Sequence, residues 1–254
     1  MFAVATVVAL LAGGAPPDPS NCSQQCTSSL QPMSTAVPNV LLLSDSIGAN
    51  GSGYYTNVIS ILGPSDSAVT GGGTIGNAKV QHTGGYGKGI CGTSYGMVAC
   101  LEQWLGKGGW DVIHFNWGLH DICAKMYAPV TPEEYYSNME QAYQKMKAAL
   151  APTGVLIWST TTPVPPSYTE RNNTDVIRIN GQMAQLFGPN ATHPDVLVSD
   201  LYSKVVQRCA RNETTKGYPQ TSDCDFLQSR GVHFSDAGKQ FTAVVTAAAI
   251  APVL

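Results

Sequence analysis

Three short segments of this sequence carry side chains that can perform nucleophilic chemistry together. Ser44-Asp45-Ser46 follows one apolar run, Gly118-Leu119-His120-Asp121 follows another, and His233 directly precedes the last helical pattern. A serine hydroxyl is too weakly acidic to ionise at neutral pH, so a nucleophilic serine needs a neighbouring base. We therefore predict Ser46 as the nucleophile and His233 as its general base. Polar groups of the second segment are then placed to donate hydrogen bonds to a developing oxyanion.

The apolar runs predict the elements that position these residues. Four runs are typical of buried strands, at 40–43, 112–115, 155–158 and 196–198, and helical patterns lie at about 93–104, 131–150, 174–187 and 235–250. Buried strands that alternate with helices predict an α/β fold, a three-layer α/β/α sandwich around a parallel sheet. Ligands of such sheets bind beyond the carboxyl ends of the strands, where Ser46 and His120 fall.

The clearest of these helices begins at Thr131-Pro132-Glu133-Glu134. Threonine can cap the helix, proline suits its first turn, and Glu134 can complete a capping box. Five apolar or aromatic residues then share one face at helical spacing, namely Met139, Ala142, Tyr143, Met146 and Leu150. The final apolar stretch, 241–254, predicts a closing helix rather than a lipid-anchor signal, because it contains Thr242 and Thr246.

The composition predicts one globular domain. The chain has 254 residues, of which 43% are hydrophobic and 12% charged, and a net charge of -3. This balance provides no basic stripe for nucleic acid and no polybasic patch for an acidic membrane. We predict a signal peptide at 1–15, an extended N-terminal arm at 16–38 and the folded domain at 39–254.

Sequons and cysteines favour an exported, glycosylated protein. Five N-x-S/T sequons occur, at Asn21, Asn50, Asn172, Asn190 and Asn212. Seven cysteines suggest local disulfides, Cys22 to Cys26, Cys91 to Cys100 and Cys209 to Cys224, with Cys123 as the odd thiol. No C-x-x-C occurs and the five histidines are scattered, so we expect neither a metal site nor a cofactor.

The order of the reactive segments resembles that of the SGNH (GDSL-like) hydrolases. Their blocks read G-D-S, then a glycine, then G-x-N-D, then D-x-x-H, and the resemblance covers about 39–250. It implies a flavodoxin-like fold with Ser46 as nucleophile and His233 as base. It also implies an oxyanion hole built from the backbone N–H groups of Ser46 and Gly92 with the side chain of His120. Gly85 and Gly89 compete with Gly92 for the position of the second-block glycine.

The sequence departs from the family pattern at three positions. Ser44 replaces the leading glycine, and His120 replaces the usual asparagine, as in a subgroup whose third block reads G-L-H-D. An imidazole N–H donates to an oxyanion only in the right tautomer or when protonated. Arg230 stands where the family has its acid. Three carboxylates are candidate substitutes, Asp223, Asp225 and Asp236; the alternatives are a dyad whose imidazole is held by a backbone carbonyl, or reduced activity.

Together with the expected export, the resemblance implies a secreted esterase that cleaves an O-acetyl or short O-acyl ester, on a carbohydrate, through an acyl-enzyme. The alternatives are a lipid esterase or acyltransferase that uses the same site, and a non-catalytic glycan-binding module that kept the fold. We expect a small-molecule or polysaccharide ester as the substrate, a monomer, no membrane span and no nucleic-acid partner.

Overall fold

The computed structural model describes residues 30, 33–48, 53–63, 78–84, 93–123, 130–165, 168, 170–209 and 231–254. One five-stranded parallel sheet runs through them in the order β2-β1-β3-β4-β5. Its strands are β1 (Asn39–Ser44), β2 (Lys79–Gly84), β3 (Trp110–Asn116), β4 (Leu150–Ser159) and β5 (Val196–Ser199).

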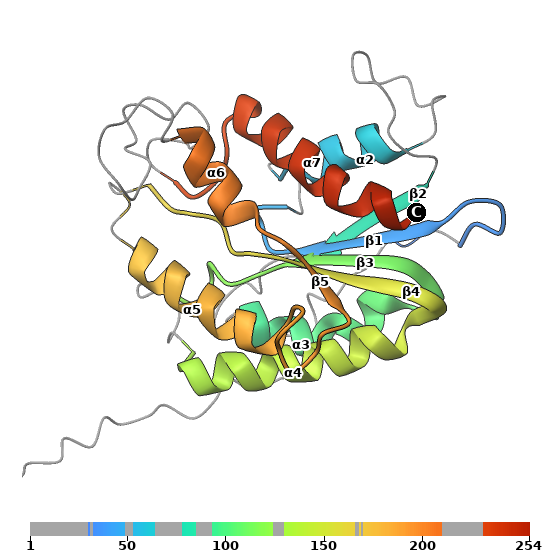
Figure 1. The fold of residues 1–254 in the computed structure, drawn as a ribbon, viewed down its shortest axis with the longest axis horizontal. Coiled ribbons are helices and arrows are strands. Elements are labelled where there is room, and N and C mark those ends of the chain that lie inside the picture. The colour runs from blue at the N-terminus through green and yellow to red at the C-terminus, as the bar shows by residue number, and fades with distance from the viewer. Residues whose placement is uncertain are drawn as a thin grey trace, which may run out of the picture.

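Helices cover both faces of the sheet (Figure 1). One face carries α2 (Tyr55–Leu62), α6 (Leu201–Cys209) and α7 (Asp236–Ile250), with α7 packed on the other two. The opposite face carries α3 (Thr93–Leu105), α4 (Pro132–Ala148) and α5 (Asn173–Leu186). A single 3-10 turn, η2 (Ala251–Val253), follows α7. The predicted three-layer α/β/α sandwich is confirmed.

The order of the strands creates a switch point beside β1. The chain leaves β1 toward β2 on one side, then returns past β1 to β3 on its other side. The connections on either side of such a reversal diverge onto opposite faces of the sheet, which opens a crevice at the carboxyl ends of the strands. The segments that follow β1 and β3 therefore face the same space.

The central strands form the core. Leu41, Leu42 and Leu43 of β1 are fully buried, because helices cover both of its faces. Burying one such side chain contributes on the order of 1.5–3 kcal/mol to the free energy of unfolding.

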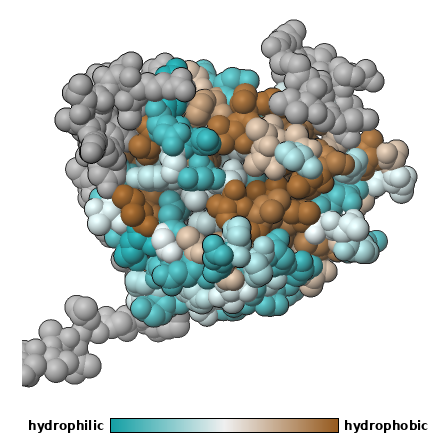
Figure 2. Space-filling view, in the orientation of Figure 1, coloured by the Kyte–Doolittle hydropathy of each residue, from teal (hydrophilic) through white to brown (hydrophobic). Residues whose placement is uncertain are grey.

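At the sheet edge, β5 leaves Leu197 and Val198 exposed. An apolar area crosses the middle of the face in Figure 2.

Three elements were missed by the sequence patterns. The sheet has five strands rather than four, because edge strand β2 contains one aliphatic residue, Val80, and so shows no apolar run. Helices α2 and α6 span only 8 and 9 residues, too short for a clear helical period. Helix α4 ends at Ala148, so Leu150 belongs to β4 and not to the helical face.

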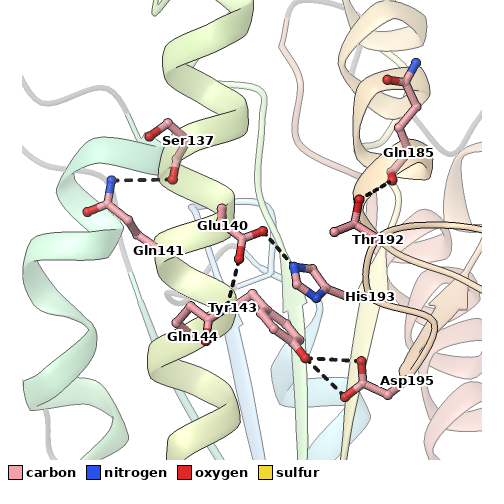
Figure 3. A network of polar contacts seen from close by, with 9 residues as sticks. All are labelled: Ser137, Glu140, Gln141, Tyr143, Gln144, Gln185, Thr192, His193 and Asp195. Carbon is pink, nitrogen blue, oxygen red and sulfur yellow. Dashed lines mark hydrogen bonds and ion pairs between the residues drawn. The ribbon is translucent and has the colours of Figure 1, made fainter.

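The predicted start of α4 is confirmed. Thr131 accepts a hydrogen bond from the Glu134 backbone N–H, and the Glu134 side chain accepts from the Thr131 N–H. The same helix is tied to the segment before β5 by a polar network (Figure 3). In it, His193 lies 2.6 Å from Glu140 and stacks on Tyr143, whose hydroxyl donates to Asp195. This network lies at the amino ends of the strands, away from the reactive segments.

A buried tyrosine–histidine pair braces the end of β1. The Tyr55 hydroxyl donates to the Leu43 carbonyl at 2.9 Å and lies 3.1 Å from His114 Nδ1. The hydroxyl has only one proton, so His114 Nδ1 must be the donor in the second contact. Burial lowers the pKa of His114 from 6.5 to about 3. This histidine is therefore neutral in the folded protein.

The neutral state of His114 predicts acid sensitivity. Below pH 6.5 the unfolded chain protonates this imidazole while the folded protein does not, so stability falls as the pH drops toward 3. Between pH 6.5 and 4.5, proton uptake by the unfolded chain lowers the free energy of unfolding by roughly 2 kcal/mol. In His114→Asn, the amide still donates to Tyr55 but does not titrate. Urea unfolding across this range should show a shallower loss of stability in the variant than in the wild type; parallel curves would contradict the assignment.

Candidate active site

Ser46 and His233 meet at the carboxyl ends of the strands. The distance from Ser46 Oγ to His233 Nε2 is 3.0 Å, which is a hydrogen bond between a hydroxyl and an imidazole. Ser46 is 6% exposed, and His233 is half-buried. A serine in this contact can lose its proton to the imidazole as it attacks an electrophile. The structure thus brings together the two residues on which the sequence argument centred.

A tight turn after β1 presents Ser46. The Asp45 carboxylate accepts the Ile47 N–H at 2.9 Å, and the Gly48 N–H donates to Ser44 Oγ at 3.2 Å. A Cβ on Gly48 would lie 2.7 Å from Ser44 Cβ and 2.9 Å from the Tyr55 ring. Glycine is therefore required at position 48, because any side chain there would push the turn out of place.

His233, the predicted base, is held by buried neighbours and by the start of α7. Val232 and Phe234 on either side of His233 are buried, and Phe234 packs edge-on against Tyr54. Ser235 caps α7 by accepting the Gly238 N–H at 3.3 Å. This alternation buries the two apolar residues and leaves the imidazole between them turned toward Ser46.

The segment after β3 is braced from β4 and α5. Asn116 donates both of its amide hydrogens, to the carbonyls of Ser159 and Thr160. Gly118 has a φ of 137°, and a Cβ there would overlap Thr161 and lie 2.6 Å from Ile179 Cδ1. This backbone conformation disfavours any residue with a side chain. The glycine of G-L-H-D is thus explained by geometry.

His120 lies in this braced segment and is 8% exposed. Its pKa is lowered to about 4, chiefly by burial and also by the nearby charges of Arg171 and His233. The imidazole is therefore neutral near pH 7 and carries a single N–H. It can serve as the expected oxyanion donor only in the tautomer that aims this N–H at the reacting centre.

Of the three candidate orienting acids, the structure describes only Asp236. Asp236 is not placed to orient His233, since its side chain is 99% exposed and pairs with Lys239 at 3.2 Å. It is the first residue of α7, so it points to solvent while the helix faces the core. Gly92, Asp223, Asp225 and Arg230 lie outside the described residues, as do Gly85 and Gly89, and their roles stay predictions.

Asp45 is a described carboxylate that acts electrostatically on His233. It is 1% exposed, and burial raises its pKa to about 6 against the opposing effects of the Ile47 N–H, Arg171 and His233. The pKa of His233 is lowered by burial, raised by Asp45, and lowered again by Arg171 and Lys239. His233 is accordingly neutral, and able to accept a proton, at neutral pH.

Sequence reasoning missed Arg171, a buried residue directly before the Asn172 cap of α5. Its Nε–H donates to the carbonyl of Leu119, the neighbour of His120. No motif or spacing in the sequence marks this arginine, because its importance comes from the fold of the segment that follows β4. In that segment, Asn173 bonds both backbone groups of Val164 and fixes the start of the helix.

Several other expectations meet the structure here. Cys123 is free and buried, as predicted for the odd thiol. Cys100 and Cys209 are disulfide-bonded, and their expected partners lie outside the described residues. No described helix is both long and apolar enough to cross a membrane. Within the same residues, no group of three or more His, Cys, Asp or Glu side chains is arranged to hold a metal ion.

The charge of Asp45 gives a prediction for His233. Asp45→Asn keeps an oxygen that accepts the Ile47 N–H but removes the negative charge, which should lower the pKa of His233 further. NMR titration of the imidazole measures this directly. Asp236→Asn is the control and should leave the His233 titration nearly unchanged. A larger shift in the control than in Asp45→Asn would show that the exposed aspartate is the one that matters.

Comparison with known proteins supports the fold. No protein-family model and no curated protein sequence matches the chain. Among solved structures, a GDSL-like lipase from Bacteroides thetaiotaomicron is 12% identical, with a TM-score of 0.60 over 93% of this chain and 98% of that one. An acetyl xylan esterase variant from Geobacillus stearothermophilus is 15% identical, with a TM-score of 0.61 over 86% and 96%. A lipolytic protein of the G-D-S-L family from Veillonella parvula is 15% identical, with a TM-score of 0.56 over 82% and 95%. This chain therefore has the fold of the GDSL-like (SGNH) lipolytic proteins and acetyl xylan esterases.

Proposed function

We propose that this protein is a secreted serine esterase that hydrolyses an O-acetyl or short O-acyl ester on a carbohydrate. The observation that carries the proposal is the 3.0 Å contact between Ser46 Oγ and His233 Nε2 at the switch point of the sheet. A glycan-binding module would not need a histidine on its serine. The acetyl xylan esterases among the structural neighbours favour an O-acetyl group.

The reaction begins when Ser46 Oγ attacks the ester carbonyl and His233 Nε2 takes its proton. The carbonyl oxygen becomes an oxyanion, for which the Ser46 N–H and neutral His120 are the proposed donors, with Gly92 as the third. When the intermediate collapses, His233 returns the proton to the leaving alcohol. Water, deprotonated by His233, then attacks the acyl-enzyme and releases the acid and free Ser46.

Export is part of the proposal. Two of the five sequon asparagines, Asn172 and Asn190, lie in described residues, and both are exposed. The disulfide-bonded Cys100 and Cys209 fit an oxidising compartment. Expression in a secreting host, followed by analysis of the medium and glycosidase treatment, tests export and glycosylation together.

The proposed mechanism predicts strongly non-additive mutations. Ser46→Ala and His233→Ala should each lower kcat/KM for 4-nitrophenyl acetate by about 10³-fold or more. The double variant should be no worse than either single variant, since the two groups perform one step. Ser60→Ala, which changes a partly exposed serine of α2, is the matched control and should retain activity.

Labelling with a fluorophosphonate gives an independent measurement. Wild-type protein and Ser60→Ala should be labelled on Ser46, and Ser46→Ala should not. Folded wild-type protein that neither reacts with the probe nor cleaves acetylated sugars would refute the proposal.

A further inference from the structure

Arg171 is buried, and its guanidinium has more N–H donors than hydrogen bonds to described residues. The residue is 6% exposed, and its Nε–H donates to the Leu119 carbonyl. Its Nη1 group donates a hydrogen bond to the Tyr168 hydroxyl at 3.1 Å. The guanidinium carbon lies 5.6 Å from the centre of the Tyr168 ring. An arginine has five N–H donors, so these two hydrogen bonds leave three.

No described carboxylate forms an ion pair with this cation. A buried charge without a counter-ion is costly, so such groups are normally paired. Asp45 lies within electrostatic reach of Arg171, but burial still raises the pKa of Asp45 to about 6. Arg171 in turn lowers this pKa, so the two groups attract each other, but they form no direct ion pair.

The guanidinium of Arg171 acts on the residues of the candidate active site. It is bonded to the residue before His120, and its charge acts on Asp45, His120 and His233. Its exposure, 6%, equals that of Ser46. The cation is thus nearly as buried as Ser46 and is hydrogen-bonded to the segment that carries His120.

We propose that Arg171 forms an anion subsite, and that the ester cleaved at Ser46 carries a carboxylate close to the scissile bond. The inference rests on the proposed esterase function and narrows its substrate class. The carboxylate can belong to the alcohol, as in an acetylated uronic acid, or to the acyl group, as in a hemiester of a dicarboxylic acid. A guanidinium suits either, because its planar N–H groups match a carboxylate in two parallel hydrogen bonds.

Two matched pairs of substrates test the proposal and separate these sources. O-acetylated galacturonate against O-acetylated galactose places the charge on the alcohol. The 4-nitrophenyl hemiester of succinate against 4-nitrophenyl butyrate places it on the acyl group. Wild-type protein should prefer the anionic member of one pair, chiefly through a lower KM, and the preferred pair identifies the source.

The variants are Arg171→Gln, Arg171→Lys and, as control, Arg178→Gln. Arg178 lies on the same helix but is exposed and pairs with Asp175 at 3.3 Å. In Arg171→Gln, the ratio of kcat/KM for the anionic and neutral members should fall by about 10- to 100-fold, the value of a charged hydrogen bond. Arg171→Lys should recover part of that ratio, and Arg178→Gln should keep it.

The pH profile gives a second readout, one that depends on the charge of Arg171 rather than on its packing. Removing the positive charge of Arg171 should raise the pKa of His233, so the acid limb of kcat/KM should move to higher pH in Arg171→Gln but not in Arg171→Lys. Thermal unfolding verifies that each variant is folded.

The outcomes separate this inference from the proposed function. Activity on neutral esters without any anionic preference in the wild type, or an equal loss on both members of each pair in Arg171→Gln, would overturn the subsite and leave the esterase intact. Absence of turnover and of fluorophosphonate labelling would overturn the esterase itself. Equilibrium binding of galacturonate to Ser46→Ala, abolished by adding Arg171→Gln, would support the subsite without any turnover.

Discussion

The hydrogen bond between Ser46 and His233 joins residues 187 positions apart in the chain. It forms only when two distant structures are both in place, the turn after β1 and the capped start of α7. The first depends on Gly48, which has no room for a side chain, and the second on Val232 and Phe234, which are buried around the imidazole. The rest of the sheet serves to hold these two points about 3 Å apart.

Burial gives the site its electrostatic character. Asp45, His120, Arg171 and His233 are all removed from much of the solvent, so the charges among them are little screened and shift the pKa values of their neighbours. Burial keeps both histidines neutral. A neutral imidazole is what the proposed roles require, His233 as a base and His120 as a donor in one defined tautomer. Among the described residues, the cationic Arg171 has hydrogen-bond partners but no carboxylate in an ion pair with it, which is the basis for the proposed anion subsite.

The sequence predicts the parts of this structure whose cause is local. Four apolar runs, the capping box at Thr131 and the order of the reactive blocks were enough for the fold class and the Ser46–His233 pair. The sequence patterns did not predict edge strand β2, because an edge strand needs fewer apolar residues. They did not identify Arg171, because its burial arises from tertiary packing when α5 docks beside the segment after β3. Asp236 was one of three candidate substitutes for the missing acid, but the first turn of α7 directs it to solvent.

The separation of Ser46 and His233 along the chain has a consequence for biosynthesis. The ribosome adds His233 187 residues after Ser46. Until α7 docks on α2, His233 is not held at Ser46, so a nascent chain lacks the contact on which the proposed chemistry depends. The docking of α7 is thus the folding step that assembles the pair.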